Sequence, residues 1–166
     1  RMWRASGFAL GVALATSNLG RLATRTGQLS VAAEEFAHAR AAFEQLHAAG
    51  FLTELDARLA TWHLSNDDPQ AALGLTDHLI AHRSEELQPT VRCQLERTAA
   101  LALFDLGRQS EATARLTLAA TIAAEAGAAF EQAATAAAAA EARLPTADPT
   151  PTWARLGVEP AARRAF

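Results

Sequence analysis

Two histidines four residues apart form the strongest candidate metal site in this sequence. His78 and His82 would lie one helical turn apart, so both imidazole rings could reach one ion, with Asp77 adjacent. The same spacing also describes polar residues on an exposed helix face, and we expect that arrangement, without a metal. Cys93 has no activating neighbour in the sequence, so we expect a small buried side chain instead of a nucleophile.

The carboxylates are also poorly placed for catalysis. Glu34 and Glu35 are adjacent, as are Glu85 and Glu86, and neighbouring residues on a helix point about 100° apart. Neither pair can therefore share one reacting group. The chain has no lysine, which excludes a Gly-x-x-x-x-Gly-Lys loop, and it lacks His-Glu-x-x-His and Cys-x-x-Cys. The sequence predicts a protein that is not an enzyme, with no catalytic residue, cofactor or metal.

The composition favours a helical domain. Half of the residues are apolar, 6% are aromatic and the net charge is −3. A weakly acidic chain lacks the basic face that nucleic acids usually require, so we expect no direct nucleic-acid binding. No apolar run approaches the ~20 residues that span a bilayer, so we expect no membrane segment. A single cysteine suits a reducing compartment, and we predict a cytoplasmic location.

The elements that would position any site repeat every 40 residues. Three alanines mark the period: Ala32, Ala72 and Ala112. A turn residue stands five positions before each of them, in the order Gly27, Asp67 and Gly107. The pattern predicts first helices over 8–26, 51–65 and 89–106, and second helices over 29–49, 69–87 and 109–126. A seventh helix is expected over 128–143, with Gly50 and Gly127 just past helix ends.

This pattern divides the chain into a repeat domain, a linker and a tail. The repeat domain covers 1–144, with units near 13–52, 53–92 and 93–132 and a half unit at 133–144. Residues 145–152 are rich in Pro and Thr and predict an extended linker. The tail, 153–166, contains Trp153, Leu156 and Phe166, which we expect to dock on the last helix.

The first unit resembles the tetratricopeptide repeat family. Asn18-Leu19-Gly20, Gly27, Ala32, Phe36 and Ala39 match the family pattern at its own spacing. The match covers 13–46 well, and 53–86 and 93–126 in degraded form. It implies an all-α, right-handed superhelical stack of about seven helices, with first helices lining a concave face. The usual unit has about 34 residues, and the sequence places the extra six at 47–52 and 87–92. HEAT-type repeats of about 40 residues are the weaker alternative.

The resemblance also implies where a partner would bind. The concave positions of the first helices are Ser17, Arg21, Thr24, Arg25, Glu54, Ala57, Thr61, Leu64, Gln94, Arg97, Leu101 and Phe104. Three of these residues are arginines, and arginine binds carboxylates through paired hydrogen bonds. We therefore expect a groove for an extended peptide that carries acidic side chains or a carboxylate.

These observations favour a protein–protein interaction scaffold. The chain begins with Arg1, and its long units resemble those of bacterial multidomain signalling proteins and transcriptional activators. We therefore expect a sensor or regulatory segment of a larger protein. Two alternatives remain open, namely a self-association module that forms homo-oligomers and a small-molecule effector domain with its ligand inside the curve of the stack.

Overall fold

The protein is helical throughout the part of the chain that its structure describes. A computed structural model describes residues 2–144, 146 and 148–157. The elements are α1 (Met2–Arg25), α2 (Leu29–Gln45), α3 (Ala49–Ser65), α4 (Pro69–Arg83), the 3-10 helix η1 (Ser84–Glu86), α5 (Pro89–Asp105), α6 (Gln109–Glu125), α7 (Ala129–Glu141) and α8 (Thr150–Arg155). The predicted all-α class is confirmed. Among the helices in these ranges, none combines the length and apolarity needed to cross a membrane.

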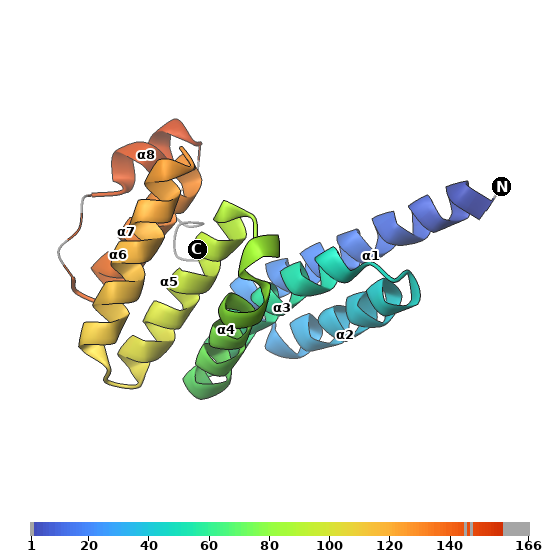
Figure 1. The fold of residues 1–166 in the computed structure, drawn as a ribbon, viewed down its shortest axis with the longest axis horizontal. Coiled ribbons are helices and arrows are strands. Elements are labelled where there is room, and N and C mark those ends of the chain that lie inside the picture. The colour runs from blue at the N-terminus through green and yellow to red at the C-terminus, as the bar shows by residue number, and fades with distance from the viewer. Residues whose placement is uncertain (1, 145, 147, 158–166) are drawn as a thin grey trace.

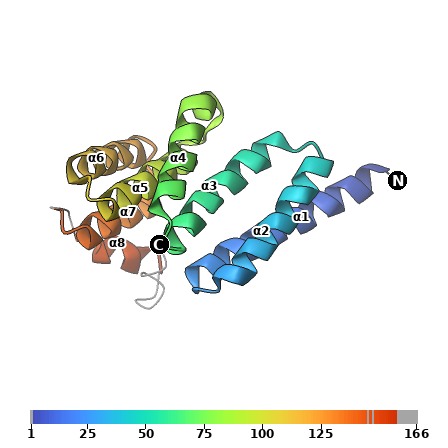
Figure 2. The same cartoon turned by 90° about the horizontal axis from the view of Figure 1, so that it is seen from below.

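Consecutive helices pack as hairpins, and the hairpins stack upon one another. α1 pairs with α2, α3 with α4, and α5 with α6 through the most extensive contacts in the protein. The first helix of each hairpin also contacts the first helix of the next, from α1 through α3 and α5 to α7. The stack runs from α1 and α2 at one end to α7 and α8 at the other (Figures 1 and 2). The predicted hairpin stack is confirmed, whereas its right-handed sense stays a prediction.

The turns between helices recur at a fixed interval. Six helices start twenty residues apart, at Leu29, Ala49, Pro69, Pro89, Gln109 and Ala129. Most of the connecting turns contain a residue with positive φ, namely Gly27, His47, Asp67, Gly107 and Gly127. Four of these five were predicted as turn positions. The turn before Pro89 differs because the residue before a proline favours an extended backbone, and Gln88 has a ψ of 145°.

Gly50 does not lie past the end of a helix, as the sequence predicted. α2 ends at Gln45, His47 takes the left-handed conformation with φ at 51°, and Gly50 lies inside α3. The six additional residues of each unit were likewise misplaced. Residues 49–52 belong to α3 and residues 89–92 to α5. The greater repeat length therefore comes from helices of 17 residues joined by short turns, not from longer connections between units.

Small side chains occupy the places where helices approach closely. The repeated alanines are fully buried: Ala32, Ala60, Ala72, Ala100 and Ala112. At Gly20, an added Cβ would stand 2.7 Å from the Cδ1 and Cε1 atoms of Phe36, a ring that is 1% exposed. This is well inside van der Waals contact, so α1 and α2 reach their spacing only with glycine at this position.

A charged cluster is buried between α4, α5 and α6. The side chain of Glu96 is 0% exposed, and its carboxylate accepts hydrogen bonds from Arg92 Nε at 2.7 Å and Arg115 Nη1 at 2.8 Å. Arg115 also forms an ion pair with Asp77 of α4. A buried carboxylate is tolerated when its oxygens are paired in this way. The cluster therefore connects three consecutive helices.

A short helix covers the C-terminal end of the stack. Residues 150–152, predicted as part of an extended linker, form the first turn of α8. Trp153 is 1% exposed, and its ring meets Phe130 of α7 edge-on with 5.4 Å between centroids. The predicted docking of the tail on the last helix is confirmed for Trp153. Leu156 is 40% exposed, and Phe166 lies outside the described residues.

Candidate binding face on the first helices

The predicted groove residues belong to three successive first helices and differ in accessibility. We call this set the first-helix face: Ser17, Arg21, Thr24 and Arg25 of α1, Glu54, Ala57, Thr61 and Leu64 of α3, and Gln94, Arg97, Leu101 and Phe104 of α5. Its apolar members pack between helices: Ala57 is 1% exposed, and Leu64, Leu101 and Phe104 lie against core clusters. The chemistry of the face therefore comes from its polar side chains.

The first polar contact joins α1 to α3. Arg58 Nη1 donates to Ser17 Oγ at 2.6 Å, and Arg58 Nη2 pairs with Glu54 Oε1 at 2.5 Å. Ser17 is 1% exposed, so its hydroxyl acts as a fixed acceptor inside the contact. Glu54 stays 42% exposed, which leaves this end of the ion pair open to solvent.

The second polar contact joins α3 to α5. Gln94 Nε2 donates to Thr61 Oγ1 at 3.2 Å, and the hydroxyls of Thr61 and Thr98 lie 3.4 Å apart. Thr61 and Gln94 are half-buried and Thr98 is buried. These side chains satisfy one another between the two helices and present amide and hydroxyl groups beside the arginines.

The third polar contact joins α5 to α7. Arg97 Nη1 donates to Glu131 Oε2 at 2.8 Å and lies 3.5 Å from Thr135 Oγ1. The Arg97 side chain is 9% exposed and Glu131 is 15% exposed, so the ion pair is largely removed from solvent. Thr135 also lies 3.6 Å from Cys93 Sγ. Arg97 is therefore held firmly in place and not mobile on the surface.

Four arginines come within electrostatic range of one another on this face, and we call them the arginine cluster: Arg21, Arg25, Arg58 and Arg97. Burial lowers the pKa of Arg25 to about 10, and Arg21, Arg97 and Arg58 lower it further against an opposing effect of Glu131. Burial also lowers the pKa of Arg58, where Glu54 opposes the shift and Arg21 adds to it. Such shifts mean that the cationic forms repel one another, so the place favours an added negative charge.

Sequence reasoning missed three residues of this face, namely Arg58, Thr98 and Glu131. A signal for two of them was present, because residues 18, 58 and 98 are spaced by 40 and are all polar. Asn18 was noticed only as part of the family motif. Glu131 carries no such signal, since its partner Arg97 lies 34 residues away.

The other candidate chemical residues lie apart from this face. His78 and His82 are exposed on α4, with ring centroids 4.5 Å apart and His82 Nδ1 at 2.9 Å from the carbonyl oxygen of His78. Among the described residues, no three His, Cys, Asp or Glu side chains are grouped to hold a metal ion. Cys93 is fully buried, and burial raises the pKa of its thiol. The geometry thus offers binding groups more than reacting ones.

Comparison with known proteins adds no assignment to these observations. The chain matches no protein-family model, no curated protein and no solved structure.

Proposed function

We propose that this chain is a non-catalytic interaction module that binds an acidic segment of a partner protein on its first-helix face. The module would serve as a sensor or regulatory segment of a larger cytoplasmic protein of the bacterial signalling or transcription-regulator type. The observation that carries the proposal is the convergence of four arginines from α1, α3 and α5.

The charge balance of the face supports an acidic partner. The four arginines of the cluster are accompanied by two carboxylates, Glu54 and Glu131, which leaves an excess of two positive charges. The chain as a whole carries a net charge of −3, so this local excess stands against the general charge of the protein. A partner with carboxylates would meet a positive patch whose surroundings repel less selective anionic surfaces.

The polar contacts of the face also support an extended ligand. They follow one another from Ser17 and Arg58 through Thr61 and Gln94 to Arg97 and Glu131. A peptide in extended conformation could therefore find hydrogen-bonding side chains on each successive first helix. Arg97 and Arg58 already have partners, so a ligand carboxylate would compete with Glu131 or Glu54 or share their arginines.

Fluorescence anisotropy with charge-matched peptides tests the proposal. We expect an extended peptide of alternating Glu and Ser to bind, with affinity falling as salt rises, and its Lys–Ser counterpart not to bind. Arg21→Gln and Arg25→Gln should each weaken binding about tenfold, because each removes a charged contact. Arg155→Gln on α8 is the control and should leave affinity unchanged. Equal binding of both peptides, or equal loss in all three variants, would contradict an arginine-based site.

Self-association is the second candidate, and the N-terminal end of the stack favours it. Val12, Leu19 and Leu22 of α1 are 49%, 54% and 57% exposed. Their counterparts 40 residues on, Leu52, Leu59 and Trp62, pack against the preceding hairpin. A second copy of the chain could cover α1 in the same manner. Sedimentation velocity should then show a dimer that Leu22→Asp dissociates, and a monomer at all concentrations would remove this candidate.

A further inference from the structure

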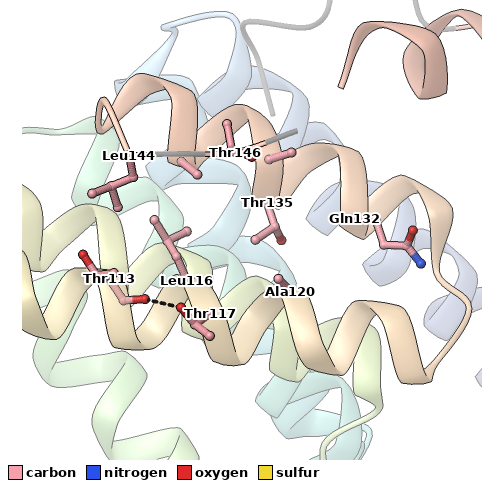
Figure 3. A pocket seen from close by; sticks show the side chains of 10 residues that line it. Thr113, Leu116, Thr117, Ala120, Gln132, Thr135, Leu144 and Thr146 are labelled. Atoms are coloured by element: carbon pink, nitrogen blue, oxygen red, sulfur yellow. Dashed lines mark hydrogen bonds between the residues drawn. The ribbon is translucent and has the colours of Figure 1, made fainter. Parts of the chain in front are cut away.

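A pocket lies between α6 and α7, apart from the first-helix face. Its volume is about 400 Å³, within the range of small-molecule sites. Figure 3 shows Leu116 and Ala120 of α6 facing Thr135 of α7, with Gln132 at one end and Leu144 at the other. The pocket opens to solvent and is lined mainly by apolar atoms.

The internal repeat shows which side chains are absent from this junction. Adding 80 to the residue numbers of the α2–α3 contact gives the lining of the pocket. Leu55 and Leu59 pack at the α2–α3 junction, with Leu55 fully buried. Their counterparts are the smaller side chains of Thr135 and Ala139.

A charged pair is also replaced at this junction. Arg40 of α2 and Asp56 of α3 form an ion pair between their helices. The counterparts 80 residues on are Ala120 and Ala136, which both line the pocket. Two large side chains have therefore become methyl groups, and the space that they would occupy is open.

The middle junction is filled like the first one. At the contact of α4 with α5, the counterparts of Leu55 and Asp56 are Leu95 and Glu96, and both are fully buried. Glu96 is held there by Arg92 and Arg115. The open space thus belongs to the third junction, where the same backbone arrangement carries smaller and uncharged residues.

The hydrogen-bonding groups of the pocket are mostly acceptors. Thr113 Oγ1 donates to the carbonyl oxygen of Gln109, and Thr117 Oγ1 donates to that of Thr113, each at 2.9 Å (Figure 3). A hydroxyl has one proton, so these two oxygens can only accept from a ligand. Among the described residues that line the pocket, none carries a charge. A charged ligand would therefore lose its hydration without a compensating partner.

We propose that the α6–α7 pocket binds a small neutral molecule that is mainly apolar and carries a hydrogen-bond donor, such as an alcohol. The apolar part would fill the space left by the missing leucine and ion-pair side chains. The donor would reach the hydroxyl oxygen of Thr117 or Thr113. This site is separate from the arginine cluster, so it neither requires nor excludes the binding of an acidic peptide.

Three probes of matched length separate the features of this ligand. The ¹⁵N-labelled full chain is titrated with 1-octanol, methyl heptyl ether and octanoate, and amide shifts are followed by NMR. We expect saturable shifts in α6 and α7 with 1-octanol, several-fold weaker binding of the ether, which has no donor, and about tenfold weaker binding of octanoate. Equal affinity for 1-octanol and octanoate, or shifts outside α6 and α7, would overturn the proposal.

Two variants and one control locate the ligand. Ala139→Leu restores the residue type of Leu59 and should reduce 1-octanol affinity at least about tenfold by filling the pocket. Ala124→Leu, at an exposed position of α6, should leave the affinity unchanged. If circular dichroism shows that Ala139→Leu is unfolded, Thr117→Val keeps the shape and removes one acceptor. This variant should bind 1-octanol only as well as the ether, and an unchanged preference for the alcohol would refute the assigned contact.

Arg21→Gln separates this proposal from the acidic-peptide site. It should leave 1-octanol binding unchanged, because Arg21 lies on the first-helix face and outside the pocket. A loss of 1-octanol binding in Arg21→Gln would contradict a separate pocket, whereas a failure of peptide binding alone would contradict only the first-helix site.

Discussion

At the scale of single residues, the buried carboxylate of Glu96 is the largest departure from what the sequence suggests. Glutamate is usually exposed, and nothing near Glu96 in the sequence predicts burial. A signal exists in the repeat, because Asp56 precedes Glu96 by 40 residues and also forms an ion pair between helices. The partners could not be predicted, since Arg40 precedes Asp56 whereas Arg115 follows Glu96.

Glu96→Gln should strongly destabilise the protein. The substitution keeps the shape of the side chain but leaves Arg92 and Arg115 without their shared carboxylate. Breaking a buried pair in this way typically costs about 3–5 kcal/mol of unfolding free energy. Urea denaturation measures the change. Glu111→Gln is the matched control, because its pair with Arg108 is exposed and should contribute little, so equal effects would contradict the role of burial.

Gly20→Ala should also destabilise the protein, for a steric reason. The new methyl group would stand 2.7 Å from the buried ring of Phe36 and force α1 and α2 apart. Overpacking of this kind costs about 1–3 kcal/mol. Gly74→Ala in α4 has no heavy atom within 4 Å of the added Cβ and should stabilise the helix by up to about 1 kcal/mol. Thermal unfolding of both variants should shift in opposite directions.

At the scale of elements, the sequence predicts helices well and their ends less well. Gly27, Gly107 and Gly127 mark turns because glycine accepts positive φ without a steric penalty. His47 occupies the same conformation, and a side chain with a Cβ gives no sequence signal for it. Gly50 was taken for the helix end for that reason. α8 was missed because Pro149 and Pro151 suggested an extended chain, although proline is compatible with the first turn of a helix.

Alanine substitutions at two glycines test these helix ends. Gly107 has φ at +75° and an open environment, so Gly107→Ala should lose about 1–2 kcal/mol through backbone strain alone. Gly50 has an equally open environment but lies inside α3, so Gly50→Ala should gain up to about 1 kcal/mol. Urea unfolding distinguishes the two signs. A loss of stability in Gly50→Ala would mean that α3 begins after residue 50.

At the scale of the whole molecule, the arginine cluster depends on how the hairpins are arranged. The family positions predicted Arg21, Arg25 and Arg97 as members of one groove, and their mutual electrostatic effects on Arg25 support that grouping. The sequence could not indicate that Arg97 is held by Glu131 of α7, because this contact depends on how two hairpins are tilted. The pocket was missed for a related reason, since empty space arises from what neighbouring helices fail to fill.

Trp153→Ala should loosen one end of the stack and leave the other unchanged. Loss of a buried tryptophan typically costs about 3–5 kcal/mol, and here the loss falls on the contact of α8 with α7. Repeat proteins distribute stability between neighbours, so hydrogen exchange should accelerate in α7 while α2 and α3 keep their protection. Leu156→Ala is the control at an exposed position of the same segment. Uniform acceleration along the chain would instead indicate a single cooperative unit.

The unequal filling of the three junctions has a mechanical consequence. Force applied to the two ends of such a stack passes through each junction in series, because the extensive contacts join consecutive helices or successive first helices. The junction of α6 with α7 holds methyl groups where the others hold leucines and ion pairs. This is therefore the weakest link under tension. A pulling experiment should release the segment from α7 onward at the lowest force, while the hairpins before it remain folded.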